Sequence, residues 1–384
     1  MLHMRYPIFV FIILISFHFG YGQPSVNIDS LKINQLQIIG SHNSYHLRAN
    51  KPVLNFLKGL SGILPKEYDP HELDYEHEPL QLQLDSFHLR SFEIDIYPDP
   101  HGGQFYYRKK NNLLGKPKAS GIAALKEPGF KVMHIPDIDY NTRYYTFKSM
   151  LADLKKWSDV HPTHLPIFIL IEGKEETIAS TLKKLHFAKA IPFTPALCDD
   201  IDTEIKAIFG DHPDKIITPD MVRGNFNTLS EAVAANNWPS IGEARGKFIF
   251  ITMEKSDKPY LIGHPNLEGR LMFTFSKEGN PEAAFIKYED PIEKEKEIKA
   301  AVQKGYIIRT RADNPNKQNR SGDYTQMMKA FESGAQIISS DYYRPDPRYK
   351  TKPKKFRNYS CRFPHGDTGI INPVTAPMIK LKEQ

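Results

Sequence analysis

The stretch LQIIGSHNSYH, residues 36–46, decides the fold, because an apolar run ends abruptly in polar side chains. Leu36–Ile39 is short and apolar, which predicts a buried β-strand. After Gly-Ser the chain continues at once with His42 and Asn43. Neither an imidazole nor a carboxamide belongs in an apolar core. The stretch therefore predicts a strand that carries two chemically active side chains to an accessible edge.

Seven further short apolar or β-branched runs follow, and segments with helical spacing separate most of them. Strands that alternate with helices predict a parallel sheet, and eight such strands predict an α/β fold of the (β/α)8 TIM-type barrel. A doubly wound open sheet is the structural alternative. The barrel is favoured because polar residues stand at the ends of many strands, whereas an open sheet gathers its site at one switch point. The expected strands are Leu36–Ser41, Leu89–Tyr97, Phe130–Ile135, Ile167–Glu172, Lys247–Met253, Leu271–Phe275, Tyr306–Arg311 and Gln336–Ser340. The expected helices are Leu80–Phe87, Gly121–Lys126, Phe147–Trp157, Glu175–Leu185, Pro291–Val302 and Tyr324–Glu332.

Two regions depart from this alternation. Residues 189–245 carry the strings IPFTPALCDD and IITPDMVRGN, whose Pro and Asp punctuation predicts a long insertion between strands four and five. From Arg344 on, RPDPRYKTKPKKF is rich in Pro and Lys, which predicts a C-terminal tail on the surface. No internal repeat or low-complexity segment divides the chain, so we expect a single domain over residues 23–384.

The first 22 residues have the layout of a secretory signal peptide. Arg5 gives a short positive region, Ile8–Phe17 is almost wholly apolar, and small residues precede Gln23. The apolar part is shorter than the roughly 20 residues that a membrane-spanning helix needs. An uncleaved anchor is the alternative. We therefore expect an exported protein, periplasmic or secreted after cleavage.

Charge and cysteine content narrow the class of protein further. Removing residues 1–22 takes away one Arg and no acid, so the formal net charge falls from +6 to +5. This mild basicity suits an anionic substrate, or transient contact with a membrane surface, but it is too diffuse to indicate nucleic acid. No protein partner is indicated. Cys198 and Cys361 could pair in an oxidising compartment, but two cysteines are no disulfide framework, so the fold must rest on its apolar core.

The second expected strand includes FEIDIY, residues 92–97, in which apolar and acidic side chains alternate. Because successive side chains point to opposite faces of a strand, Glu93 and Asp95 share one side and the isoleucines share the other. In a barrel the acidic side is the interior. Two carboxylates there would repel each other and lose hydration unless a cation lies between them. A solvated strand face or an ion pair with Arg90 is the alternative.

Two more expected strands end in groups of the same kind. His134 follows the run FKVM, and Glu172 follows the five apolar residues Ile167–Ile171. Taken singly, each fits an ordinary strand end or a satisfied core residue better than a site. Together with the first two strands, however, they place polar side chains at the carboxyl ends of four consecutive strands. In a barrel those ends form one rim, where active sites are assembled.

The expected rim contains four oxygen-bearing side chains and no thiolate: Asn43, Glu93, Asp95 and Glu172. Such ligands suit a hard cation, and Ca²⁺ is favoured over Mg²⁺ because so many protein ligands leave less room for retained waters. His42 and His134 remain as an acid–base pair beside the metal.

The strings around these residues resemble the phosphoinositide-specific phospholipase C superfamily, and in more detail its calcium-dependent branch found in exported microbial proteins. They extend from about Gln37 to Ala376 and are far more specific than any single His or Glu. The strings are GSHNSYH, FEIDIY, HIPDID, LKKWSDVHPTHLPIFILIEGKE, LSEAVAANNWPSIGEARGKFIF, GYIIRTRAD, SGAQIISSDYYRP and INPVTAP. The fold that the resemblance implies is a TIM-type barrel, in agreement with the strand count.

Carried over by position, the resemblance implies that His42 and His134 are the two catalytic histidines. It implies that the four oxygen-bearing residues, Asn43, Glu93, Asp95 and Glu172, bind calcium. The implied substrate is a phospholipid or a related phosphodiester, whose headgroup hydroxyl attacks its own phosphorus, forms a cyclic phosphate and releases the lipid alcohol. Glu93 is the favoured acceptor of the hydroxyl proton, with Asp95 as the alternative.

Cations near the expected rim complete the site for a phosphate. Lys174 shares a side with Glu172, Lys255 lies just past the fifth strand, and Arg309 and Arg311 share a side of the seventh. Each could instead be an exposed charge. Lys174 and Arg311 are favoured because they lie closest to strand ends.

Two alternative functions remain open. A glycerophosphodiester phosphodiesterase has the same barrel, but the resemblance implies His-Arg-Gly at its first strand, where this chain has His-Asn-Ser. A non-catalytic lipid-headgroup or carbohydrate-binding module would keep the barrel without turnover. The full set of histidines and acids favours the enzyme.

Overall fold

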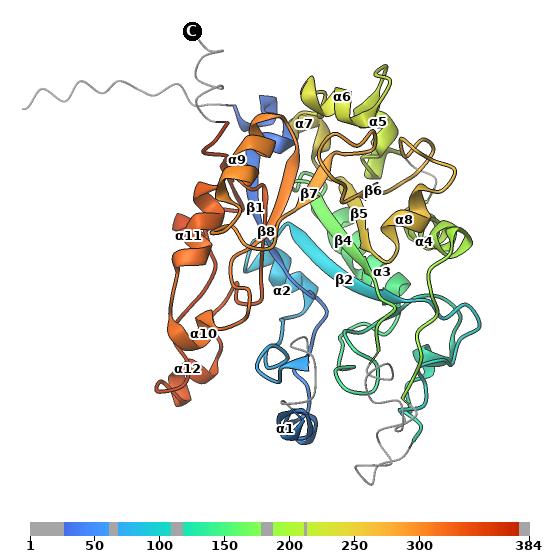
Figure 1. Cartoon of the computed structure of the whole chain (residues 1–384), viewed down its shortest axis with the longest axis vertical. Coiled ribbons are helices and arrows are strands. Elements are labelled where there is room, and N and C mark those ends of the chain that lie inside the picture. Colours follow the sequence, from blue (N-terminus) through green and yellow to red (C-terminus); the bar gives the residue numbers. More distant parts are fainter. Residues whose placement is uncertain (1–26, 61–67, 109–117, 178–186, 211–212, 376–384) are drawn as a thin grey trace, which may run out of the picture.

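The computed structural model describes residues 27–60, 68–108, 118–177, 187–210 and 213–375. Eight parallel strands follow one another in the order β6-β5-β4-β2-β1-β9-β8-β7, and a single parallel bridge between Phe275 and Phe285 joins the two outer strands (Figure 1). The predicted (β/α)8 barrel is therefore confirmed, as a nearly closed parallel barrel. The parallel strands are β1 Leu36–Ser41, β2 Ser91–Tyr97, β4 Ile167–Gly173, β5 Phe248–Glu254, β6 Phe273–Thr274, β7 Phe285–Lys287, β8 Ile307–Arg311 and β9 Ile337–Ser340.

The alternation of β2 sets which side chains face the interior. Glu93 contacts Arg309 on β8, which is not a neighbour of β2 in the sheet, so the two side chains meet across the barrel interior. Asp95 lies opposite Glu172 in the β2–β4 ladder and therefore shares this face. The isoleucines of β2 are fully buried on the opposite face, in the apolar core.

One predicted strand has a different role in the structure. The segment Phe130–Ile135 contributes only the two-residue strand β3, Lys131–Val132, which pairs antiparallel with the end of β2. The prediction of a third barrel strand there is wrong. The barrel is completed instead by β7, whose three residues are too short a run to produce a periodic signal. His134 consequently lies in the loop after β3, and not at the end of a barrel strand.

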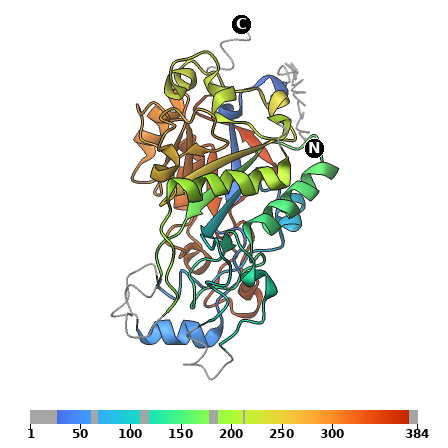
Figure 2. The same ribbon diagram turned by 90° about the vertical axis from the view of Figure 1, so that its right-hand side faces the viewer.

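Helices surround the barrel, and α3 and α4 lie side by side on its outer face (Figure 2). The predicted insertion between β4 and β5 is largely helical and contains α4, α5, α6 and α7; Thr194, Thr218 and Thr228 cap the first three of these through their side-chain oxygens. Of the predicted helix Glu175–Leu185, residues 178–185 lie outside the described residues, and the part before them is not helical. The helices are α1 Lys51–Gly59, α2 Leu80–Asp85, α3 Phe147–Val160, α4 Pro195–Phe209, α5 Pro219–Arg223, α6 Leu229–Ala234, α7 Ile241–Ala244, α8 Asp257–Leu261, α9 Glu295–Gln303, α10 Gln318–Ser321, α11 Thr325–Glu332 and α12 Arg348–Thr351.

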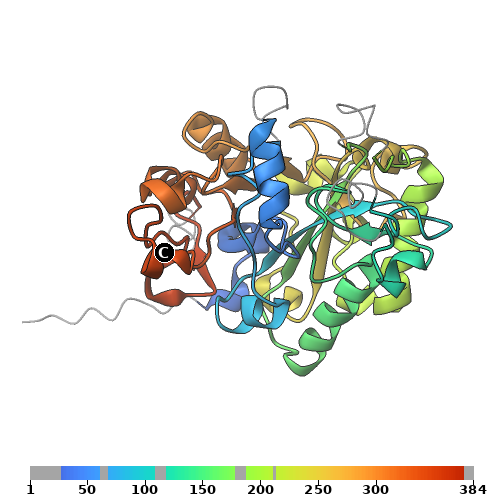
Figure 3. The ribbon, with the colours of Figure 1, turned by 90° about the horizontal axis from the view of Figure 1, so that it is seen from below.

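The loops at the carboxyl ends of the strands form one end of the molecule, which Figure 3 shows from below with α1 in front. Val53 and Leu57 of α1 pack against Ile135 and Ile138, which belong to the segment that follows His134. This small apolar cluster is separate from the main core. It fixes the loop that carries His134 against the end of the barrel.

The C-terminal segment does more than cover the surface. After α12 it returns to the other end of the barrel, where β10, Gly369–Ile371, pairs antiparallel with the first half of β1. Cys198 and Cys361 are both buried and unpaired. Within the described residues, no helix is long and apolar enough to span a bilayer. The predicted signal peptide, residues 1–22, lies outside the described residues.

Candidate active site

The turn after β1 is held in place by a buried hydrogen-bond network. Ser44 accepts from the backbone amide of Glu93 at 2.9 Å through its hydroxyl oxygen. Gln83 of α2 donates to the Ser44 carbonyl at 2.9 Å, and the amide of His42 donates to the carbonyl of Ser340 at 3.2 Å. Asn43, between His42 and Ser44 in the chain, has a φ of 48°, which is uncommon for a residue with a Cβ. The positions of His42 and Asn43 are thus fixed by β2, α2 and β9 together.

Three carboxylates converge at the carboxyl ends of β2 and β4. Ligand oxygens of Glu93, Asp95 and Glu172 all lie within 4.8 Å of one another. Burial is the largest influence on Asp95 and raises its pKa well above the usual range, although the Lys174 ammonium lies 3.6 Å from its Oδ2. Burial also opposes ionisation of Glu172, but Lys174, which donates to Oε1 at 2.8 Å, lowers the pKa of Glu172 to about 2.

Several oxygens at this cluster have no hydrogen-bond partner among the described residues. Both carboxylate oxygens of Asp95 and the side-chain oxygen of Asn43 are buried and accept no hydrogen bond, although the Asn43 amide nitrogen donates to the Tyr75 hydroxyl at 3.0 Å. Buried polar atoms without partners are costly, so their presence indicates a missing ligand. Carboxylate and amide oxygens are the donors that hard divalent cations such as Ca²⁺ and Mg²⁺ prefer. The residues present therefore fit such an ion.

His42 is oriented by a carboxylate that directly follows the last barrel strand, β9. Its Nδ1 lies 2.9 Å from Oδ1 of Asp341, and its Nε2 lies 3.6 Å from Oε1 of Glu93. Arg311 donates to the other oxygen of Asp341 at 2.7 Å. Burial opposes ionisation of Asp341, but the His42 imidazole and the Arg311 guanidinium hold its pKa well below the usual range. Asp341 is therefore a fixed anion that presents His42 to the acidic cluster.

His134 is oriented by a different carboxylate, which it shares with a third histidine. Its Nδ1 and the Nε2 of His46 each lie 2.8 Å from Oδ2 of Asp139. Burial opposes ionisation of Asp139, but the two imidazoles hold its pKa well below the usual range. His46 in turn stacks on Tyr75 with 4.3 Å between ring centroids, and Tyr75 contacts Asn43. A continuous set of contacts thus joins Asn43 to His134.

The predicted phosphate-binding cations lie in different surroundings. Arg309 is fully buried and donates to Glu93 at 2.6 Å and to Glu289 at 2.7 Å, so both ends of its guanidinium are occupied by carboxylates. Lys174 faces the acidic cluster. Lys255 is exposed and forms an ion pair with Glu176 at 2.8 Å.

A cavity of about 390 Å³ lies beside these groups. His134, Glu172, Lys174 and Lys255 line it, together with Tyr97. The cavity volume is near the lower end of the range of about 300–1,000 Å³ typical of small-molecule sites, which suits a single headgroup.

The structure brings most of the predicted residues together. Glu93, Asp95 and Glu172 form one cluster, His42 and Arg309 contact Glu93, and Lys174 joins the other two acids. The residues that sequence reasoning did not select are the supporting ones: His46, Tyr75, Asp139, Glu289 and Asp341. Two signals could have found some of them: the motif HNSYH contains His46, and the motif HIPDID contains Asp139.

The fold and the site together define a class, the TIM-barrel phosphodiesterases, in which two histidines accompany a cluster of carboxylates that could hold a metal ion. A model of the family described as "Phosphoinositide phospholipase C, Ca2+-dependent" matches residues 31–373. The chain belongs to this family, whose enzymes are phosphoric diester hydrolases.

Similar solved structures include two bacterial enzymes. A calcium-dependent phosphoinositol-specific phospholipase C from a Pseudomonas species, in its apo form, is 14% identical with a TM-score of 0.50, over 90% of this chain and 96% of that chain. A Ca²⁺-dependent phosphatidylinositol-specific phospholipase C from Streptomyces antibioticus is 15% identical with a TM-score of 0.48, over 86% of this chain and 100% of that chain. No curated protein matches the chain.

Proposed function

We propose that this protein is a calcium-dependent phospholipase C that cleaves phosphoinositide-like phosphodiesters through a cyclic phosphate. The observation that carries the proposal is the convergence of Glu93, Asp95 and Glu172 within 4.8 Å, beside His42 at 3.6 Å from Glu93. The second histidine, His134, lines the adjoining cavity with its own aspartate behind it.

The metal ligands in this proposal are Asn43, Glu93, Asp95 and Glu172. These residues would hold the ion through side-chain oxygens, of which those of Asn43 and Asp95 accept no hydrogen bond from the described residues, with Ca²⁺ favoured over Mg²⁺ because of the number of protein oxygens. When bound, Ca²⁺ supplies Lewis-acid chemistry, which lowers the pKa of the attacking hydroxyl and offsets charge on the phosphoryl group.

The chain's own residues manage the protons. In the first step the headgroup hydroxyl forms a bond to phosphorus while the bond from phosphorus to the lipid oxygen breaks. Glu93 takes the hydroxyl proton, and His134 gives a proton to the leaving oxygen. His42, held through Nδ1 by Asp341, presents Nε2 to the phosphoryl oxygens and stabilises their negative charge. Water then opens the cyclic phosphate with the proton transfers reversed.

The four predicted cations have unequal roles in this proposal. Lys174 and Lys255 line the catalytic cavity, so they are the ones placed to contact the phosphate or the headgroup ring. Arg309 and Arg311 act on the substrate through other residues, because their guanidinium groups hold Glu93 and Asp341. Arg309 in particular neutralises Glu93 while no ion is bound.

Contact with a lipid surface has support from charge placement. From Pro347 to Gly366 the chain contains no acid, and six of its cations are exposed: Lys350, Lys352, Lys354, Lys355, Arg357 and Arg362. This segment follows the carboxyl end of β9, on the side of the barrel where the strands present the catalytic groups. Such a segment is attracted to anionic lipid headgroups, at about 1 kcal/mol per cation near the surface. Export of the protein through its N-terminal segment is part of the same proposal and stays a prediction.

Calcium titration with two substrates tests the proposal. We expect release of inositol phosphate and diacylglycerol from phosphatidylinositol vesicles, dependent on Ca²⁺ and abolished by chelation, with cyclic inositol phosphate as the first product. Asp95→Asn should raise the calcium concentration needed, whereas Asp153→Asn, an acid on α3, serves as the matched control. Turnover of glycerophosphoinositol in place of the lipid would establish a glycerophosphodiester phosphodiesterase, and binding without turnover would establish a headgroup-binding module.

A further inference from the structure

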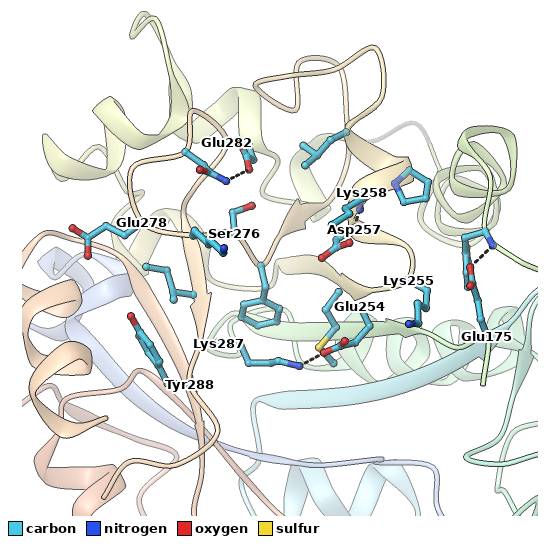
Figure 4. A pocket seen from close by; sticks show the side chains of 18 residues that line it. Glu175, Glu254, Lys255, Asp257, Lys258, Ser276, Glu278, Glu282, Lys287 and Tyr288 are labelled. Carbon is cyan, nitrogen blue, oxygen red and sulfur yellow. Dashed lines mark hydrogen bonds and ion pairs between the residues drawn. The ribbon is translucent and has the colours of Figure 1, made fainter. Parts of the chain in front are cut away.

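A second and larger cavity lies outside the catalytic groups, at the carboxyl ends of β5, β6 and β7 (Figure 4). Its volume is about 1140 Å³. The cavity exists because β6 and β7 share a single bridge and the segment between them, residues 276–284, contains no helix. The layer of helices around the barrel is therefore interrupted at this seam, and only the short α8 covers one side.

This seam cavity adjoins the catalytic cavity, since two residues line both. Glu254 and Lys255, which follow one another at the end of β5, line both. Glu254 also forms an ion pair with Lys287 of β7, which Figure 4 shows across the inner wall of the seam cavity. A ligand whose reacting phosphodiester occupies the catalytic cavity can therefore extend past Glu254 into the seam cavity.

The carboxylates of the seam cavity are already satisfied. Five acids line it, and each accepts a hydrogen bond or an ion pair from a neighbour: Glu254 from Lys287, Glu278 from Lys304, Glu282 from Asn280, and Glu175 and Asp257 from backbone amides. This arrangement does not call for a further cation. It also leaves each carboxylate with unused acceptor capacity towards a hydroxyl donor.

The basic groups are fewer than the acids. Four lysines line the cavity, of which Lys255 and Lys287 are paired with glutamates. The ammonium groups of Lys258 and Lys277 form no hydrogen bond or ion pair with the described residues. Because acids outnumber lysines, an anionic ligand would meet net repulsion, while an acyl chain would remove water from nine charged groups. The ligand that fits is neutral and offers both hydroxyl donors and acceptors.

Apolar surfaces alternate with these polar groups. Phe193, Phe275 and Tyr288 line the cavity together with Met253 and Ile286. Aromatic and aliphatic faces beside hydrogen-bonding groups suit sugar rings, which present C–H faces and hydroxyl edges. We propose that the seam cavity binds a glycosyl substituent on the headgroup whose phosphodiester is cleaved. The inference rests on the proposed function, because the substituent is held by the same substrate.

Two substrates that differ only in the substituent test this inference. We compare vesicles of phosphatidylinositol with vesicles of the same lipid that carries a glucosyl group on its inositol ring, using the full chain with Ca²⁺. For the wild-type protein kcat/KM should be higher for the glucosylated lipid. Tyr288→Ala and Lys277→Ala should each lower kcat/KM for the glucosylated lipid by about tenfold, through an increase in KM at unchanged kcat. Neither variant should change kcat/KM for phosphatidylinositol. Lys296→Ala, an exposed lysine of α9, is the matched control.

A binding measurement separates this inference from the proposed function. Glucosyl-myo-inositol should bind to the wild-type protein more tightly than myo-inositol, and Lys277→Ala should remove the difference. Equal affinities for the two compounds, or variants that affect both lipids equally, would overturn the seam cavity as a glycosyl site. If neither lipid is cleaved, the proposed function fails. The difference in affinity between glucosyl-myo-inositol and myo-inositol would still show whether the seam cavity binds the glycosyl group. Tighter binding of inorganic phosphate than of the glycoside at this cavity would also overturn it.

Discussion

Arg309 of β8 donates from Nη2 to Oε2 of Glu93 of β2 at 2.6 Å, across the interior of the barrel. The pair joins a residue predicted to bind phosphate to a residue predicted to bind metal. The Nη1 nitrogen of Arg309 donates to Glu289. Burial opposes ionisation of Glu289, but Arg309, Arg311 and Lys287 outweigh it and lower the pKa of Glu289 to about 2. The guanidinium therefore compensates two carboxylates beneath the site.

Removing this compensation should make the protein depend on calcium for stability. Arg309→Gln leaves the buried Glu93 without its cation and takes one of two cations from Glu289; breaking a buried pair costs about 3–5 kcal/mol. A bound Ca²⁺ would offset the charge on Glu93. In urea unfolding, the increase in unfolding free energy on adding Ca²⁺ should be larger for Arg309→Gln than for the wild type, with Arg309→Lys between them. Equal increments in all three proteins would show that Arg309 and the ion do not share Glu93.

Asp341 should be needed for turnover but not for calcium binding. Asp341→Asn removes the charge that fixes the His42 ring, so kcat should fall by about 10²–10⁴-fold, the range that general acid–base groups contribute. Asp313→Asn is the matched control, because Asp313 lies near Asp341 and contacts Ser340 but no histidine. The measurements are kcat and calcium affinity for both variants, and we expect a loss of kcat in Asp341→Asn alone. Equal losses of kcat in the two variants would assign Asp341 a structural role only.

The shared acceptor Asp139 should set the protonation of His134. In His46→Phe the ring can still stack on Tyr75, but Asp139 loses one of its two imidazole partners. Its carboxylate then acts on His134 alone, which should raise the pKa of His134 and move the corresponding limb of the kcat–pH profile to higher pH. Asp139→Asn removes the charge altogether and should move that limb the other way. An unshifted profile in His46→Phe would mean that His46 does not act through Asp139.

The part of the site that the sequence predicted is the part encoded by strand alternation. Glu93 and Asp95 are two residues apart, and because side chains alternate along a strand, the sequence predicted that they share one face. Glu172 was predicted because an apolar strand ends in this acid. The register that puts Asp95 opposite Glu172 turned this pattern into one cluster.

The supporting residues could not be predicted in the same way. Asp341 is 299 positions from His42, and no local pattern links them, because closure of the barrel brings β9 next to β1. The loop after β3 was misread for a related reason. Phe130–Ile135 is apolar enough for a barrel strand, but its residues pair antiparallel with the end of β2 and support a loop, which composition alone does not distinguish.

Acid should destabilise the protein through His164, which lies between α3 and β4, outside the residues of the proposed site. Its Nδ1 donates to the carbonyl of Leu165 at 2.6 Å and its Nε2 lies 2.8 Å from the hydroxyl of Ser158. Burial lowers its pKa from 6.5 to about 4, against a smaller opposing effect of the Leu165 carbonyl. Because the folded pKa is lower than the unfolded one, this stabilisation is fully present above about pH 6.5 and is lost progressively as the pH falls towards 4.

At about 1.4 kcal/mol per pKa unit, the loss from His164 amounts to about 2–3 kcal/mol between pH 7.5 and 4. His164→Gln can keep a donor to the Leu165 carbonyl but cannot take up a proton, so its unfolding free energy should fall less over this range than that of the wild type. His161→Gln, at an exposed histidine three residues earlier, should retain the full wild-type decrease. Urea unfolding of the three proteins at both pH values measures the difference, and parallel decreases in all three would show that His164 is not the group that titrates.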